Sequence, residues 1–169
     1  MCSSDLLSPS MDIQVSSNFE RLLFELAGRN GKAVTAMMAR FRAERTLTLP
    51  PAQRAKLDRL FVGARADDAE TMAMIRLPLA ATGELVDPHT AIGLAAAAAQ
   101  RGDRAVPMIT AATAHPAKFP DAVEKACGVR PALPPRLAGL MDKPERVTVL
   151  PNDLAAVQDF VAGRVRSAA

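Results

Sequence analysis

The first half of the chain places its apolar residues with the period of an α-helix. In the first such stretch they recur at i, i+3, i+4 and i+7, as Phe19, Leu22, Leu23 and Leu26. This spacing predicts a helix over residues 16–28 with one apolar face. Ser17 and Glu20 have the spacing of a capping box, and Gly28 suits a left-handed end.

The same reasoning predicts further helices along the chain. Each begins at a capping residue or a proline and ends near glycine or proline. We expect a second helix after a turn at Asn30-Gly31, and another that starts at Asp67 and that Pro78 kinks or ends. The remaining expected helices span 51–60, 88–101 (capped by Asp87), 116–126 (ended by Gly128) and a last one to about 165, capped by Asn152 or Asp153.

Three short apolar runs read as strands, at residues 61–64, 106–110 and 147–150. The run 106–110 is continuously apolar, as in a strand buried on both faces of a sheet. Helices that alternate with such runs predict an α/β fold with mostly parallel pairing. The strands are too few and too short to complete a sheet by themselves, so we expect that part of the domain is missing.

Composition narrows the functional classes. The chain is 49% hydrophobic and 23% charged, with a net charge of +3 and no Trp or Tyr. Mixed charges without a basic block argue against nucleic-acid binding, and no apolar run is long enough for a membrane span. The two cysteines form no paired motif, and the two histidines lack the spacing of a zinc site.

The segment TAATAHPAKFPDA, residues 110–122, carries the most suggestive chemistry. Thr113 should lie just beyond the 106–110 strand, at the edge where open α/β sheets bind ligands. The amides of Ala117, Lys118 and Phe119 should be the unpaired donors of the next helix, so a hydroxyl and an anion-binding helix start would converge. The alternative is a plain strand–turn–helix connection with a proline at the first helical position.

Three segments in order resemble motifs of the threonine synthases: residues 8–21 (SPSMDIQVSSNFER), 82–91 (TGELVDPHTA) and 113–119 (TAHPAKF). The likeness runs from about residue 7 to the C-terminus. Any one segment alone would be weak, whereas three in the family's order and spacing are specific.

The resemblance implies a fold and an activity. Threonine synthases are pyridoxal-phosphate enzymes of the tryptophan-synthase-β-like fold, also called fold type II, and convert O-phospho-L-homoserine and water to L-threonine and phosphate. In this fold a hydroxyl residue near the C-terminus faces the pyridine nitrogen of the cofactor, and Thr113 matches that position. A neutral hydroxyl would temper the cofactor as an electron sink, which favours elimination and replacement.

The resemblance also suggests residues that line the site. His115 and Lys118 would line it or help to bind phosphate, although His115 could equally cap a helix. Lys118 is not expected to be the lysine that bonds the cofactor, because the family's lysine lies well upstream. Asp87 and His89 should cap and orient a wall of the cavity. Asp12, Asn18 and Arg21 belong to a matching motif without an assignable role, and Arg21 could equally be a solvated residue.

We therefore expect residues 7–169 to be the C-terminal part of a threonine synthase, an incomplete domain, and residues 1–6 to be an artefactual start; the alternative for residues 1–6 is an ordinary disordered N-terminus. The parent protein should be a cytoplasmic enzyme with a small-molecule substrate, without nucleic-acid or membrane partners. The chain alone should be inactive and poorly soluble. The rival hypothesis is a free-standing α/β interaction or regulatory module without cofactor, and a metal hydrolase using His89 and His115 is a weaker third.

Overall fold

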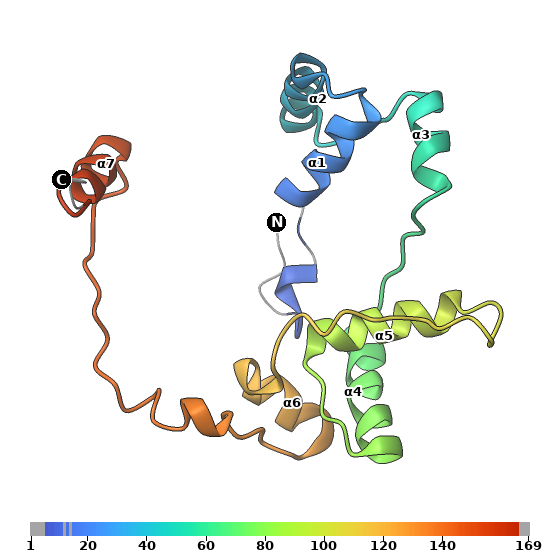
Figure 1. The fold of residues 1–169 in the computed structure, drawn as a ribbon, viewed down its shortest axis with the longest axis vertical. Coiled ribbons are helices and arrows are strands. Elements are labelled where there is room, and N and C mark those ends of the chain that lie inside the picture. Colours follow the sequence, from blue (N-terminus) through green and yellow to red (C-terminus); the bar gives the residue numbers. More distant parts are fainter. Residues whose placement is uncertain (1–5, 12, 14, 166–169) are drawn as a thin grey trace. The chain divides into compact units, whose positions relative to one another are not determined.

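All regular secondary structure among the described residues is helical. The computed structural model describes residues 6–11, 13 and 15–165, and the chain divides into two compact units, Met1–Ala132 and Leu133–Ala169 (Figure 1). The first unit contains η1 (Pro9–Met11), α1 (Ser17–Leu26), α2 (Gly31–Glu44), α3 (Pro51–Asp58), α4 (Asp68–Thr82), α5 (Pro88–Gln100), η2 (Pro116–Lys118) and α6 (Pro120–Cys127). The second contains η3 (Pro135–Leu137) and α7 (Leu154–Ala162).

Polar caps fix the starts of most helices. The N-cap of α1 is Ser16, whose hydroxyl accepts from the Phe19 amide at 3.4 Å, so the predicted capping box at Ser17 is wrong by one residue. A true capping box occurs at α4, where Asp67 and Glu70 each accept a hydrogen bond from the other's amide, at 2.8 and 2.9 Å. Such reciprocal bonds satisfy two of the donors that a helix start leaves free.

Two further local expectations need correction: the turn at Asn30-Gly31 is wrong, and of the two outcomes expected at Pro78, a kink or an end, the end is wrong. Asn30 does not form a turn with Gly31 but caps α2, accepting from the Ala33 amide at 3.1 Å. Helix α4 does not end at Pro78; it continues to Thr82, whose hydroxyl donates to the Pro78 carbonyl at 2.9 Å, and it ends at Gly83. The helix therefore tolerates one proline, because regular bonding resumes beyond it.

The predicted glycine and aspartate caps are confirmed at four positions. Gly28 and Gly128 have positive φ angles of 65° and 72° at the ends of α1 and α6, where the absence of a Cβ removes the steric cost. Asp87 and Asp153 cap α5 and α7 with their side chains.

The three predicted strands are wrong for the described part of the chain. Residues 61–64, 106–110 and 147–150 form no ladder, and the α/β class is not realised there. A strand exists only where a second backbone pairs with it, and no described segment offers these runs a partner. Apolar side chains in them are instead open to solvent: Ile109 and Val149 are each 89% exposed.

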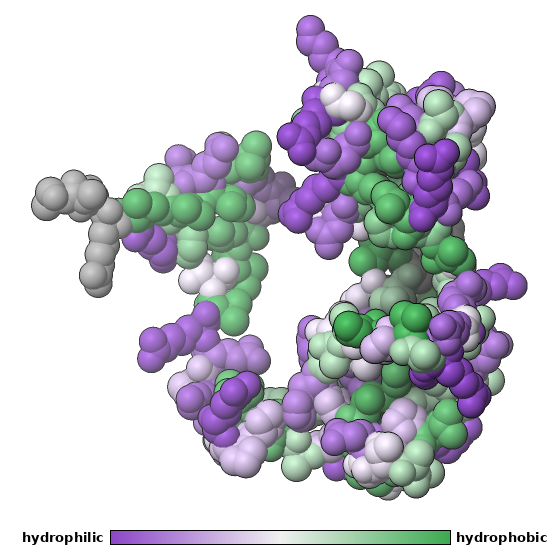
Figure 2. All heavy atoms as spheres, turned by 45° about the vertical axis from the view of Figure 1, so that its right-hand side comes forward, coloured by the Kyte–Doolittle hydropathy of each residue, from purple (hydrophilic) through white to green (hydrophobic). Residues whose placement is uncertain are grey.

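Two small apolar clusters pack helices of the first unit against one another. In one, α4, α5 and α6 bury Ile75, Ala91 and Val123 completely, with Ala126 beside them. The other joins α1 and α2 through Leu23, Met37, Met38 and their partly buried neighbours. Apolar side chains also reach the surface in Figure 2, so much of the hydrophobic sequence is not covered by these clusters.

Candidate functional site

The N-terminus of α5 holds the most buried polar residue in the part of the chain that the structure describes. Asp87 has no exposed surface, and its carboxylate accepts from the His89 amide at 2.9 Å and from the Thr90 hydroxyl. It also lies 3.1 Å from Nδ1 of His89. The sequence produces this cluster locally, because an aspartate N-cap followed by proline places the next residues in the first helical turn.

The contact with Asp87 fixes the orientation of His89. A carboxylate oxygen only accepts hydrogen bonds in this arrangement, so Nδ1 of the imidazole carries the proton that faces it. The ring is 6% exposed, and its other nitrogen, Nε2, is enclosed with no hydrogen-bond partner among the described residues. The face of the ring lies against Phe119, with the ring centroids 4.5 Å apart and the planes tilted by 47°.

The segment around residues 113–119 differs from the prediction. The expected helix 116–126 is divided into η2 and α6, and Phe119 stands between them. The amide of Ala117 donates to Nδ1 of His115 at 3.1 Å, and the amides of Lys118 and Phe119 donate to the carbonyls of His115 and Pro116. These three amides are therefore already paired, and the expectation of an open anion-binding helix start is wrong.

Two of the sequence motifs meet at this point. The contact between His89 and Phe119 joins the start of α5 to the turn that carries His115 and Lys118. The ammonium of Lys118 lies 5.5 Å from the centroid of the Phe119 ring, within the range of a cation–π interaction. The hydroxyl of Thr113 is exposed and makes no hydrogen bond to another described residue.

A glycine in α5 allows the chain before this turn to lie against the helix. A Cβ built on Gly93 would come within 2.9 Å of Cγ2 of Thr110. Only a residue without a side chain accepts so close an approach. Gly93 thus serves a close packing contact between α5 and an extended segment of the chain.

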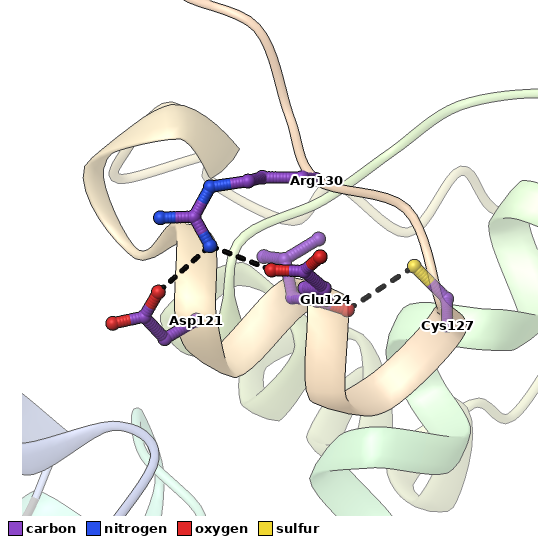
Figure 3. A network of polar contacts seen from close by, with 5 residues as sticks. Asp121, Glu124, Cys127 and Arg130 are labelled. Carbon is purple, nitrogen blue, oxygen red and sulfur yellow. Dashed lines mark hydrogen bonds and ion pairs between the residues drawn. The ribbon is translucent and has the colours of Figure 1, made fainter.

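Two ion pairs join Arg130, which follows α6 in the chain, to acidic residues of that helix. Figure 3 shows Arg130 reaching back to Asp121 and Glu124, with N–O distances of 2.9 and 2.6 Å. The hydrogen bonds to Glu124 and Asp121 raise the pKa of the Arg130 guanidinium above its usual value. Arg76 of α4 donates to the carbonyl of Ala126 at 3.0 Å, so the end of α6 is fixed to α4.

Residues of the first motif segment, 8–21, line cavities elsewhere in the first unit. Asn18 lines a cavity with α3 and residues 61–63, and Arg21 lines a separate one between α1 and α2. Neither cavity includes residues of α5 or of the 113–119 segment, so the structure does not bring these two side chains to the Asp87 cluster. Asp12 lies outside the described residues.

Sequence reasoning missed Thr90, Gly93 and Phe119 as members of this site. The Asp–Pro–His–Thr order was a usable signal for Thr90, because a residue three positions after an N-cap can reach the cap's side chain. Phe119 and Gly93 gave no such signal, since their roles depend on contacts with distant segments. Within the described residues there is no group of three potential metal ligands and no helix long and apolar enough to cross a bilayer.

Comparison with known proteins gives a consistent result. Residues 90–161 match the family model "Threonine synthase, C-terminal". The threonine synthase of Pseudomonas aeruginosa is 53% identical over 157 residues, which are 92% of this chain and 34% of that protein. The threonine synthase of Corynebacterium glutamicum is 35% identical over 94% of this chain.

Solved structures agree with the sequence matches. The crystal structure of PLP-bound threonine synthase from Brucella melitensis superposes with a TM-score of 0.80 and 44% identity, covering 95% of this chain and 34% of that one. The fold and the three motifs thus define a C-terminal region of the kind found in threonine synthases. The chain is similar to a C-terminal part of threonine synthases and spans about a third of the length of the relatives it matches.

Proposed function

We propose that this chain forms the C-terminal part of a pyridoxal-phosphate-dependent threonine synthase. The complete protein converts O-phospho-L-homoserine and water to L-threonine and phosphate. The observation that carries the proposal is 53% identity to a threonine synthase along 92% of the chain. The rival hypothesis of a free-standing module without cofactor is not favoured by these matches.

Thr113 is the residue proposed to contact the cofactor, at its pyridine nitrogen. The hydroxyl fits this role because it is exposed and makes no hydrogen bond to another described residue. A threonine hydroxyl is neutral and can donate or accept, so it supports the ring nitrogen without holding a proton on it as a carboxylate would. When bound, pyridoxal phosphate supplies an electron sink for carbanion chemistry at the amino-acid substrate.

The neighbouring residues are proposed to shape the site. His115 uses Nδ1 to accept from the Ala117 amide, so its other ring nitrogen is the one available to a ligand. Lys118 is exposed and offers a positive charge that attracts a substrate phosphate. Asp87 and His89 form a rigid wall behind the turn. Asn18 and Arg21, which line separate cavities, and Asp12 keep no assigned role.

The remaining two thirds of the enzyme are proposed to supply the lysine that bonds the cofactor and the loop that holds its phosphate. On this proposal the 169-residue chain alone is inactive. The complete protein is proposed to act in the cytoplasm on a small substrate, without nucleic-acid or membrane partners.

A chimera tests the function directly. In it, this chain replaces the matching third of the Pseudomonas aeruginosa threonine synthase, which it resembles along 92% of its own length. We expect the chimera to restore growth of a threonine auxotroph without added threonine, and to release phosphate from O-phosphohomoserine in the purified state. The chain expressed alone is the matched control and should do neither. A chimera that folds and binds pyridoxal phosphate but releases no phosphate would overturn the proposal.

A further inference from the structure

The side chain of His89 is held by Asp87 at the start of α5. Asp87 fixes one edge of the imidazole through Nδ1, and the carboxylate is itself fixed by the His89 amide and the Thr90 hydroxyl. The second ring nitrogen, Nε2, is closed to solvent and has no hydrogen-bond partner among the described residues. The ring also contacts the side chain of Phe119.

The residue in contact with the imidazole joins two helical segments. Phe119 is the C-cap of η2 and the N-cap of α6, with φ −130° and ψ 55°, and no side-chain hydrogen bond caps α6 there. Its ring lies 4.5 Å from that of His89. This ring contact links the turn directly to α5, beside the packing of the following helix α6 in the core that contains Ala91.

We propose that His89 is a positioning residue that acts through Phe119. Asp87 holds the imidazole, the imidazole holds the Phe119 ring, and the ring fixes the Pro116–Lys118 turn so that the hydroxyl of Thr113 is held in place. The inference rests on the proposed function insofar as Thr113 contacts the cofactor. In this proposal, residues 87–90 (Asp-Pro-His-Thr) position residues 113–116 (Thr-Ala-His-Pro).

The chemistry of positioning predicts a particular kinetic pattern. A misplacement of about 1 Å at a reacting centre can cost roughly 100-fold in rate. We expect His89→Asn, which keeps a polar group near Asp87 but removes the ring, to lower kcat of the chimera about 10- to 100-fold. KM for O-phosphohomoserine should change by less than about threefold, because ground-state binding of the substrate is not the interaction removed. Affinity for pyridoxal phosphate should fall as well.

A second readout does not depend on catalysis. Hydrogen–deuterium exchange should rise at the amides of Lys118 and Phe119 in His89→Asn, with or without cofactor. His89→Phe, which keeps a ring against Phe119, should restore much of this protection. Met38→Ala is the matched control, because it removes a buried side chain from the α1–α2 cluster, and it should raise exchange there but not at 117–119.

A double-mutant cycle separates this role from general destabilisation. If His89 acts through Phe119, adding Phe119→Leu to His89→Asn should cause little further loss of kcat, because both changes break the same contact. Independent, multiplicative losses would overturn the inference, as would unchanged exchange at 117–119 in His89→Asn. If the unmodified chimera makes no threonine, the proposed function fails, and the exchange experiment still decides whether His89 positions the turn.

Discussion

The Thr90 hydroxyl donates to a carboxylate that has no exposed surface. A hydrogen bond to a charged group contributes more than one between neutral groups, and a buried carboxylate that loses a donor is left poorly solvated. We therefore expect Thr90→Val, which keeps the shape of the side chain, to lower the free energy of unfolding by about 1.5–3 kcal/mol.

The chain contains a matched control for this change. Thr71 is equally buried, but its hydroxyl donates to a neutral backbone carbonyl, that of Asp67, at 2.7 Å. Thr71→Val should cost only about 0.5–1.5 kcal/mol. Urea unfolding of the chimera measures both variants. Equal losses would mean that the charge of Asp87 does not strengthen its bond to Thr90.

At this scale, sequence patterns predict what is local and fail where distant residues meet. The caps at Asp87 and Asp153 were predictable because a cap needs only its own side chain and the next two or three amides. Two adjacent serines were enough to displace the predicted start of α1 by one residue. The burial of His89 could not be predicted, because Phe119, which covers its ring, is remote in sequence.

Among the elements, α5 depends on the absence of a side chain at Gly93. A methyl group there would meet Thr110 at 2.9 Å, closer than carbon atoms pack. We expect Gly93→Ala to displace the 106–110 segment from the helix, and to raise hydrogen–deuterium exchange in residues 106–112 of the chimera. The gain in helix propensity, about 1 kcal/mol for Gly to Ala, should be offset by this displacement.

Gly31 provides the comparison. It lies at the start of α2, and a Cβ added there would meet no atom within 4 Å. Gly31→Ala should therefore leave exchange at 106–112 unchanged and leave stability equal or slightly improved. If both variants leave the 106–112 segment equally protected, the close contact between Gly93 and Thr110 has no structural role.

The helices were predictable as elements and the strands were not, for a physical reason. A helix closes its hydrogen bonds within one segment, so its apolar period and caps are sufficient signals. A strand needs a second backbone, and residues 106–110 and 147–150 find none among the described residues. The apolar composition of these two runs still marks them as segments suited to burial. Ile109 and Val149 are nevertheless exposed.

For the whole molecule, this exposed apolar surface predicts how the chain behaves by itself. A monomer rarely keeps so many large apolar side chains open to water unless another surface covers them. We expect the isolated chain to bind the dye ANS strongly and to associate as its concentration rises, whereas the chimera should bind little dye and remain monodisperse in light scattering. An isolated chain that stays monomeric without binding dye would indicate that these side chains need no cover.

The covalent attachment of the cofactor is a property of the complete protein and is tested in the chimera. Lys118 is the lysine that lies within a motif, yet its ammonium is placed over the Phe119 ring, 5.5 Å from the centroid, on the surface of the turn. The resemblance assigns the bonding lysine to the region outside these residues. Borohydride reduction of the chimera with pyridoxal phosphate should therefore label a lysine contributed by the Pseudomonas part, and Lys118→Arg should leave the yield of labelled protein unchanged. Peptide mapping by mass spectrometry identifies the labelled residue. Label found at Lys118, and lost in Lys118→Arg, would transfer the covalent role to this chain and contradict the assignment of Thr113 and Lys118 to supporting contacts.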